Sequence, residues 1–191
     1  MGGRRERGSK RYIALLRGIN VGGKNPLPMR ALVDMFQNVG CSRVESYIQS
    51  GNVVFNAGPI LARRVPSMIE LQIQKQFGFG VPILVRAADE LRALASANPF
   101  LARDPSSLHL MFLADAPSLE QIATLDARRF APDAFAVCGA NVFLYLPEGS
   151  ARTKLRTSYF DRALATTSTV RNWNTVQKLI ALSTDVGYAP P

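Results

Sequence analysis

The sequence predicts an α+β protein built from two similar units, each an antiparallel sheet with helices on one face. Three observations support this fold class. The 191 residues are 47% hydrophobic and 19% charged, which is typical of a chain that buries a substantial core. Short apolar runs alternate with segments of helical periodicity. The order of these segments also partly repeats in the second half, which indicates an internal duplication.

The first half has the element order βαββαβ. In chain order we expect a strand over 12–17, a helix over 29–39, strands over 43–48 and 52–56, a helix over 60–77 and a strand over 82–86. Gly40 ends the first helix, and Ser50-Gly51 favours a tight turn between the paired strands. Pro66 is expected in the first turns of the second helix, where a proline is tolerated. This order is that of a ferredoxin-like unit.

The second half repeats much of this order. We expect a helix over 89–97, a strand over 108–114, a helix over 119–127, strands over 134–138 and 142–146, a helix over 154–164, a vestigial strand over 167–169 and a closing helix over 173–182. The two hairpins are also alike, since Asn52-Val53-Val54-Phe55 resembles Asn141-Val142-Phe143-Leu144. The expected organisation is a disordered basic tail over 1–10, a first unit over 11–87 and a second unit over 88–191. The second unit has extra terminal helices and packs tightly on the first.

The net charge of +9 favours acidic partners, although the first ten residues contribute part of it. Arg4, Arg5, Arg7 and Lys10 face only Glu6 there, and the tail is not followed by the apolar run of a signal peptide. Because no apolar run approaches the length of a membrane span, we expect a cytoplasmic protein without membrane contact. The chain has two cysteines, Cys41 and Cys138, which we expect to be buried free thiols.

A glycine-rich basic loop follows the first strand and is the main candidate for a functional site. It reads Arg17-Gly18-Ile19-Asn20-Val21-Gly22-Gly23-Lys24-Asn25. Glycines expose successive backbone N–H groups, and the two cations add positive charge, which together suit a phosphate or a carboxylate. The alternative is a loop that only connects the strand to the helix. A P-loop is disfavoured because Asn25 replaces the Ser or Thr that binds Mg²⁺, and prolines follow where its helix should continue.

The predicted topology brings a second segment to this loop. In a ferredoxin-like unit, the loop after the first strand and the hairpin between the second and third strands emerge at the same end of the sheet. The resulting surface combines Asn20 and Lys24 with Gln49, Ser50 and Asn52. Gln49 and Asn52 can donate hydrogen bonds to a ligand. Ser50 is disfavoured as a nucleophile because it lacks the G-x-S-x-G setting and a nearby histidine.

The second half offers weaker candidates. Arg171 and Asn172 precede the last helix, where a cation opposes the helix dipole unless it meets an anion, and where Asn172 or Asn174 can cap. Arg152, Lys154 and Arg156 form another basic group, for which the same argument holds. His109, the only histidine, is expected to be structural rather than a catalytic base. With one histidine and dispersed carboxylates, no metal or cofactor is expected.

Four segments resemble the signatures of the domain of unknown function 1697 family. They are Tyr12–Asn25, Tyr47–Phe55, Asn98-Pro99-Phe100 and Arg171–Val176, and the resemblance spans about residues 11–184. The resemblance implies a bacterial protein with a pair of ferredoxin-like units, and it implies no activity or catalytic residue. The chain departs from the family pattern at Thr153, where serine is usual, and at Thr157, where asparagine is common.

These observations lead to three functional hypotheses. The first is binding of a phosphate-bearing ligand, a nucleotide or a nucleic acid, by the Arg17–Asn25 loop and the Gln49–Asn52 hairpin. The second is a metal-independent enzyme that acts on a small anionic metabolite and uses Lys24, His109 or Ser50. The third is an adaptor that binds a protein partner through sheet edges or helix faces.

Overall fold

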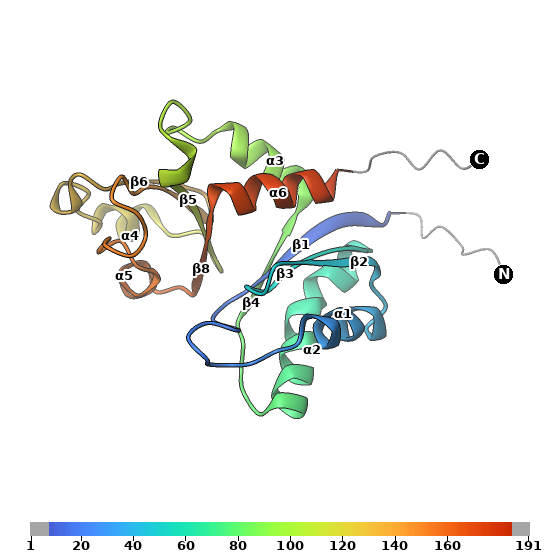
Figure 1. Ribbon diagram of the computed structural model, residues 1–191. Helices are drawn as coiled ribbons and strands as arrows, with labels where there is room; N and C mark the ends of the chain where they lie inside the picture. The colour runs from blue at the N-terminus through green and yellow to red at the C-terminus, as the bar shows by residue number, and fades with distance from the viewer. Residues whose placement is uncertain (1–7, 185–191) are drawn as a thin grey trace. The chain divides into compact units, whose positions relative to one another are not determined.

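The computed structural model describes residues 8–184 and shows two four-stranded sheets with their helices (Figure 1). The elements of the first half are β1 (Lys10–Leu16), α1 (Met29–Asn38), β2 (Ser42–Tyr47), β3 (Asn52–Ala57), α2 (Pro59–Phe77), β4 (Ile83–Ala87) and α3 (Ala88–Ser96). Those of the second half are β5 (Leu108–Leu113), α4 (Leu119–Ala123), β6 (Ala134–Cys138), β7 (Asn141–Tyr145), α5 (Thr157–Ala163), β8 (Ser168–Asn172) and α6 (Trp173–Ser183).

The two sheets have the same topology, which confirms the predicted fold class. Their strand orders are β2-β3-β1-β4 and β6-β7-β5-β8, and every pair of neighbouring strands is antiparallel. Each order is that of a ferredoxin-like unit, in which the first and third strands lie at the centre. The described chain divides into two compact units, with the boundaries inside α3 and α6, so that residues 179–184 belong with the first unit.

The duplication extends to individual backbone hydrogen bonds. The amide of Leu16 donates to the carbonyl of Gly51 at 2.8 Å, and the amide of Leu113 donates to Ala140 at 2.9 Å. At the next residue, Arg17 donates to Pro82 at 3.0 Å, and Ala114 donates to Thr167 at 2.8 Å. The ends of β1 and β5 are therefore held in the same way, and residues of the two units can be compared one by one.

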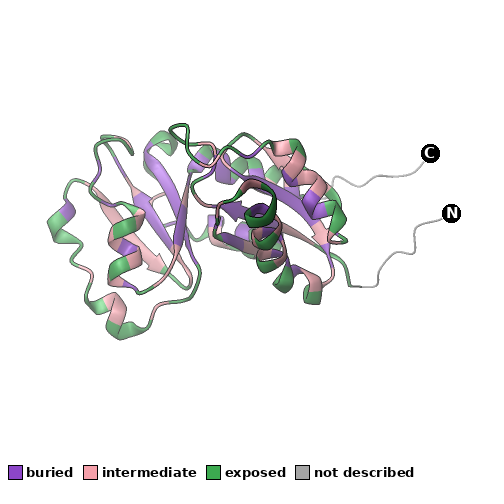
Figure 2. Ribbon diagram, turned by 90° about the horizontal axis from the view of Figure 1, so that it is seen from below, coloured by how far each residue is buried: buried purple, intermediate pink, exposed green. Residues whose placement is uncertain are grey.

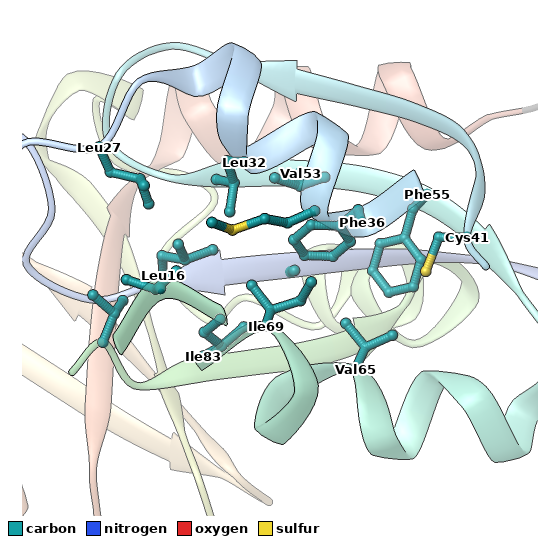
Figure 3. Packing of buried hydrophobic residues seen from close by; sticks show 14 of the residues in the cluster. Leu16, Leu27, Leu32, Phe36, Cys41, Val53, Phe55, Val65, Ile69 and Ile83 are labelled. Carbon is teal, nitrogen blue, oxygen red and sulfur yellow. The ribbon is translucent and has the colours of Figure 1, made fainter. Parts of the chain in front are cut away.

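Helices α1 and α2 cover one face of the first sheet and form its core with the strands (Figure 3). Leu32 and Phe36 of α1 point at this face, and the rings of Phe36 and Phe55 lie 5.1 Å apart. Val65 and Ile69 of α2 complete the packing. α2 begins at Pro59, one residue before the predicted start, and Pro66 lies inside this helix.

In the second unit, one face of the sheet packs with Phe160 of α5. Buried residues concentrate in the strands of both units (Figure 2), and all six residues of β5 are buried. Because successive side chains of a strand point to opposite faces, both faces of β5 are covered.

Several predicted boundaries are wrong. Lys10 belongs to β1, where it pairs with Ala57, so the tail does not extend to residue 10; residues 1–7 lie outside the described part of the chain. β8 is a full strand over Ser168–Asn172 because it pairs with β5 along its whole length. α4 ends at Ala123, and α5 begins only at Thr157.

Of the two cysteines that were expected to be buried, Cys41 is buried, whereas Cys138 is exposed. The prediction is therefore wrong for Cys138.

Candidate functional site

The glycine loop is built around a tight turn over Val21–Lys24. The amide of Lys24 donates to the carbonyl of Val21 at 3.0 Å, and the two central glycines have φ of 58° and 72°. Positive φ at both central positions is typical of a type I′ turn. Few residues other than glycine adopt this backbone conformation readily. All four turn residues are exposed. Within residues 8–184, the amides of Gly22 and Gly23 donate no hydrogen bond, so they are available to a ligand.

Asn20 joins this loop to the β2–β3 hairpin. Its side-chain amide donates to the carbonyls of Leu27 and Gln49, both at 2.9 Å, and its Oδ1 accepts from the amide of Leu27 at 2.8 Å. Leu27 is itself a core residue, so these hydrogen bonds connect Asn20 to the hydrophobic interior. Asn25 closes the loop further, since its amide donates to the carbonyl of Gly18 at 2.9 Å.

Gly51 and Asn52 fix the β2–β3 hairpin, and Gly51 packs closely against the end of β1. A Cβ atom on Gly51 would lie 2.7 Å from Leu16 Cβ and 2.8 Å from Ile19 Cδ1, so only glycine fits. Asn52 is fully buried, and its amide donates to Tyr47 O at 3.1 Å and Ser50 Oγ at 3.0 Å. The two segments therefore meet, as the topology predicts, and form a surface that we call the rim (residues 17–25 and 48–52).

The predicted site residues have different positions in the rim. Lys24 and Gln49 are exposed, and Arg17 and Ser50 are half-buried. Within the described chain, the Lys24 amine makes no ion pair or hydrogen bond. The side chains of Asn20 and Asn52 are instead committed to hydrogen bonds inside the chain. These two residues hold the rim in shape, whereas Lys24 and the glycine amides face solvent.

The rim also contains two exposed aliphatic residues that the sequence did not indicate as candidate site residues. Val21 is 62% exposed and Ile48 is 48% exposed. Ile48 also has a φ of 49°, an unfavourable conformation for a β-branched residue. Backbone strain of this kind persists where the surrounding structure enforces it, often at ligand sites. A β-branched residue before a turn predicts only a strand. The sequence therefore does not indicate the left-handed conformation of Ile48.

The second unit has no equivalent of this basic loop. The matching hydrogen bonds place Ala114 at the position of Arg17, and the residue that follows is Asp115 rather than Gly18. The connection from β5 to α4 is also short, with a capping box at Ser118. A glycine-rich basic loop after the first strand of a unit therefore occurs in the first unit alone among residues 8–184.

Arg171 and Asn172 lie in β8 of the second unit. Arg171 is buried, and its guanidinium donates to Thr169 Oγ1 at 2.8 Å and to Val170 O at 2.9 Å. Burial lowers the pKa of Arg171 to about 10. Asn172 Oδ1 accepts from the amide of Thr175 at 2.8 Å and so caps α6.

His109 is buried in β5, and its Nδ1 has no hydrogen-bond partner in the described chain. Burial lowers the pKa of His109, which favours the neutral ring. No group of three or more His, Cys, Asp or Glu side chains that could hold a metal ion occurs between residues 8 and 184. In the same range, no helix has both the length and the apolar character of a membrane span.

The sequence profile described as Protein of unknown function (DUF1697) matches residues 9–143. The chain belongs to the DUF1697 family. A solved structure of the conserved bacterial protein SP0830 from Streptococcus pneumoniae is similar at 25% sequence identity, with a TM-score of 0.71. The similarity covers 93% of this chain and 100% of that chain. A search of curated proteins found no match. This DUF1697 member therefore has a fold similar to that of SP0830, while its rim has to be interpreted from its own geometry.

Proposed function

We propose that this protein binds a phosphate-bearing ligand at the rim. The observation that supports the proposal best is the convergence of the glycine turn and the β2–β3 hairpin, which Asn20 links through Gln49. The exposed amides of Gly22 and Gly23 and the Lys24 amine offer donors and charge on one short turn. Successive backbone N–H groups with a nearby cation form a recurrent arrangement for anion binding.

Each part of the rim has a role in this proposal. The glycine amides receive phosphate oxygens, and Lys24 neutralises their charge, with Arg17 as a second cation directly after β1. Gln49 orients the ligand by hydrogen bonding. Val21 and Ile48 supply apolar contacts for the organic part of the ligand, because both are exposed beside the polar groups.

Binding is a better explanation than catalysis for this surface. Residues 17–25 and 48–52 contain no histidine and no carboxylate, so the rim has no ordinary general base. All four residues of the turn over Val21–Lys24 are exposed, which leaves a reacting group in contact with water. Both features favour a ligand that is held rather than transformed.

Within this class, the structure favours a nucleotide or small phosphorylated ligand over RNA stacked on the sheet. The aromatic residues that could stack bases, Tyr12 and Phe55, lie with their rings 5.8 Å apart on the face that packs against α1 and α2. Phe55 is a fully buried core residue, and Tyr12 is partly buried against the same core. A single-stranded nucleic acid would have to bind through the rim alone, by contacts to its phosphates.

A thermal-shift screen with nucleotides, phosphosugars and oligonucleotides tests the proposal. A ligand at about 100 times its Kd stabilises the protein by about 2.7 kcal/mol, which raises Tm by roughly 5–10 °C for a chain of this size. We expect Lys24→Ala to weaken binding about ten- to a hundredfold, because a charge-assisted contact is lost.

Lys75→Ala is the matched control, since Lys75 is also exposed but lies in the last turn of α2. It should bind like the wild type. An oligonucleotide response that falls steeply with salt would assign the ligand to nucleic acid, whereas a flat response assigns it to a small molecule. Equal shifts for the wild type and Lys24→Ala, or no shift with any ligand, would contradict the proposal.

A further inference from the structure

A cavity in the second unit forms a candidate site that is separate from the rim. It has a volume of about 150 Å³ and lies between the segment before β6 and the segment before α5. Its lining includes Arg129, Phe130, Asp133, Glu148, Arg152, Thr153 and Lys154. None of these residues contributes to the proposed function described above.

The walls of the cavity are fixed by buried side chains. Thr153 is 7% exposed, and its Oγ1 donates to Asp133 Oδ2 at 2.5 Å, which ties the two segments together. The same oxygen accepts from the amide of Leu155 at 2.9 Å. Phe130 is buried and packs edge-on against Tyr159, with ring centroids 4.8 Å apart. The cavity is thus part of a packed framework rather than a gap between loose loops.

Three exposed cations line this framework, namely Arg129, Arg152 and Lys154. In the described chain, none of them forms an ion pair with a carboxylate. The three cations outnumber the two carboxylates of the lining, so the cavity attracts an anion. Of the two acidic residues in the lining, Asp133 is engaged by Thr153, whereas Glu148 makes no ion pair in residues 8–184.

The size of the cavity restricts the class of ligand. A cavity of about 150 Å³ accepts a molecule about as large as benzene, whereas drug-sized ligands occupy pockets of roughly 300 Å³ or more. A nucleotide is therefore too large to be enclosed, and a phosphoryl group with two or three carbons fits.

We propose that this cavity binds a small phosphomonoester that also carries a hydroxyl group. Arg129, Arg152 and Lys154 receive the phosphoryl oxygens, and the free carboxylate of Glu148 accepts a hydrogen bond from the ligand hydroxyl. This assignment uses every charged group of the lining, since the Asp133 carboxylate remains the anchor of Thr153.

Isothermal titration calorimetry with glycerol 3-phosphate tests the assignment on the full-length protein, with glycerol as the uncharged comparison. We expect saturable binding of the phosphate ester and none of glycerol. Arg152→Gln and Lys154→Gln should each weaken binding at least tenfold. Both residues are exposed, so these variants should fold, which circular dichroism can verify.

The chain offers close controls for both variants. Arg128 and Arg156 are exposed neighbours that do not line the cavity, so Arg128→Gln and Arg156→Gln should bind within twofold of the wild type. Because Lys24→Ala removes the main rim cation, Arg152→Gln should still lower the affinity at least tenfold when it is added to Lys24→Ala, which separates this site from the rim. The assignment is overturned if the wild type shows no saturable binding, if the control variants lose as much affinity as Arg152→Gln, or if only Lys24→Ala loses it.

Discussion

Asn20 and Asn52 are polar residues that the sequence places in the candidate site, and both have their amide groups engaged inside the chain. A sequence pattern identifies such residues as possible ligand donors because side-chain amides bind either a ligand or the backbone. Only the structure distinguishes these roles, here through the bonds from Asn20 to Leu27 and Gln49. Their removal is therefore expected to disturb the shape of the rim before it affects any direct contact with a ligand.

His109 provides a prediction about pH at the scale of one side chain. Burial lowers its pKa below the ordinary value of 6.5, so below that pH the unfolded chain binds a proton more readily than the folded chain. The free energy of unfolding should therefore fall as the pH drops from 6.5 through the pKa of the folded state. Urea unfolding between about pH 5 and pH 8 measures this dependence.

The control for this prediction is His109→Gln, which removes the titrating group, so the stability of this variant should depend less on pH. Because the chain has a single histidine, one imidazole signal in an NMR titration reports its pKa directly. A midpoint above 6.5, or an equal pH dependence in the variant, would contradict the burial argument.

At the scale of elements, the β2–β3 hairpin depends on Gly51. Gly51 has a φ of 76°, and a Cβ atom there would meet Leu16 Cβ at 2.7 Å. We expect Gly51→Ala to destabilise the protein by about 2–4 kcal/mol, because left-handed strain adds to overpacking. Gly139→Ala is the control, since Gly139 lies in the hairpin of the second unit with a φ of 53° and no atom within 4 Å of the added Cβ.

Gly139→Ala should lose only about 1–2 kcal/mol, the cost of the backbone conformation. Chemical denaturation of both variants gives the difference. Equal losses would mean that the close approach of Gly51 to β1 contributes nothing to stability.

The order of elements could be predicted from the sequence because apolar periodicity determines which segments form strands and helices. Each error in an element boundary has its own physical cause. α5 begins only at Thr157 because the Arg156 amide donates to the carbonyl of Lys154, and this three-residue turn is too tight for an α-helix. β8 is longer than predicted because its pairing with β5 is a long-range contact that a local pattern does not reveal.

The candidate site was predictable only in part, for the same reason. Glycine and charge at 17–25 indicated an anion site, and the ferredoxin-like topology predicted its meeting with the hairpin. The left-handed conformation of Ile48 and the exposure of Val21 were not predictable. Each of these features arises in a turn of the folded chain, where the turn overrides the strand preference of a β-branched residue.

At the scale of the whole molecule, the DUF1697 chain contains one architecture twice, with different chemistry in each copy. Equivalent hydrogen bonds hold the ends of β1 and β5, yet Arg17 in the first unit corresponds to Ala114 in the second. The first unit has the exposed glycine turn, and the second has the cationic cavity around Arg152. Duplication thus conserves the framework, while the charged surfaces differ between the copies.

The central claim is that the exposed turn amides of the first unit receive a phosphate group. An NMR titration of the ¹⁵N-labelled protein with pyrophosphate and AMP tests this claim most directly, because it observes those amides. The account predicts saturable shifts at Gly22, Gly23 and Lys24, and smaller or no shifts at Gly78 and Gly139, which are exposed glycines of positive φ elsewhere. Unchanged signals at Gly22 and Gly23, or equal shifts at all four glycines, would contradict it.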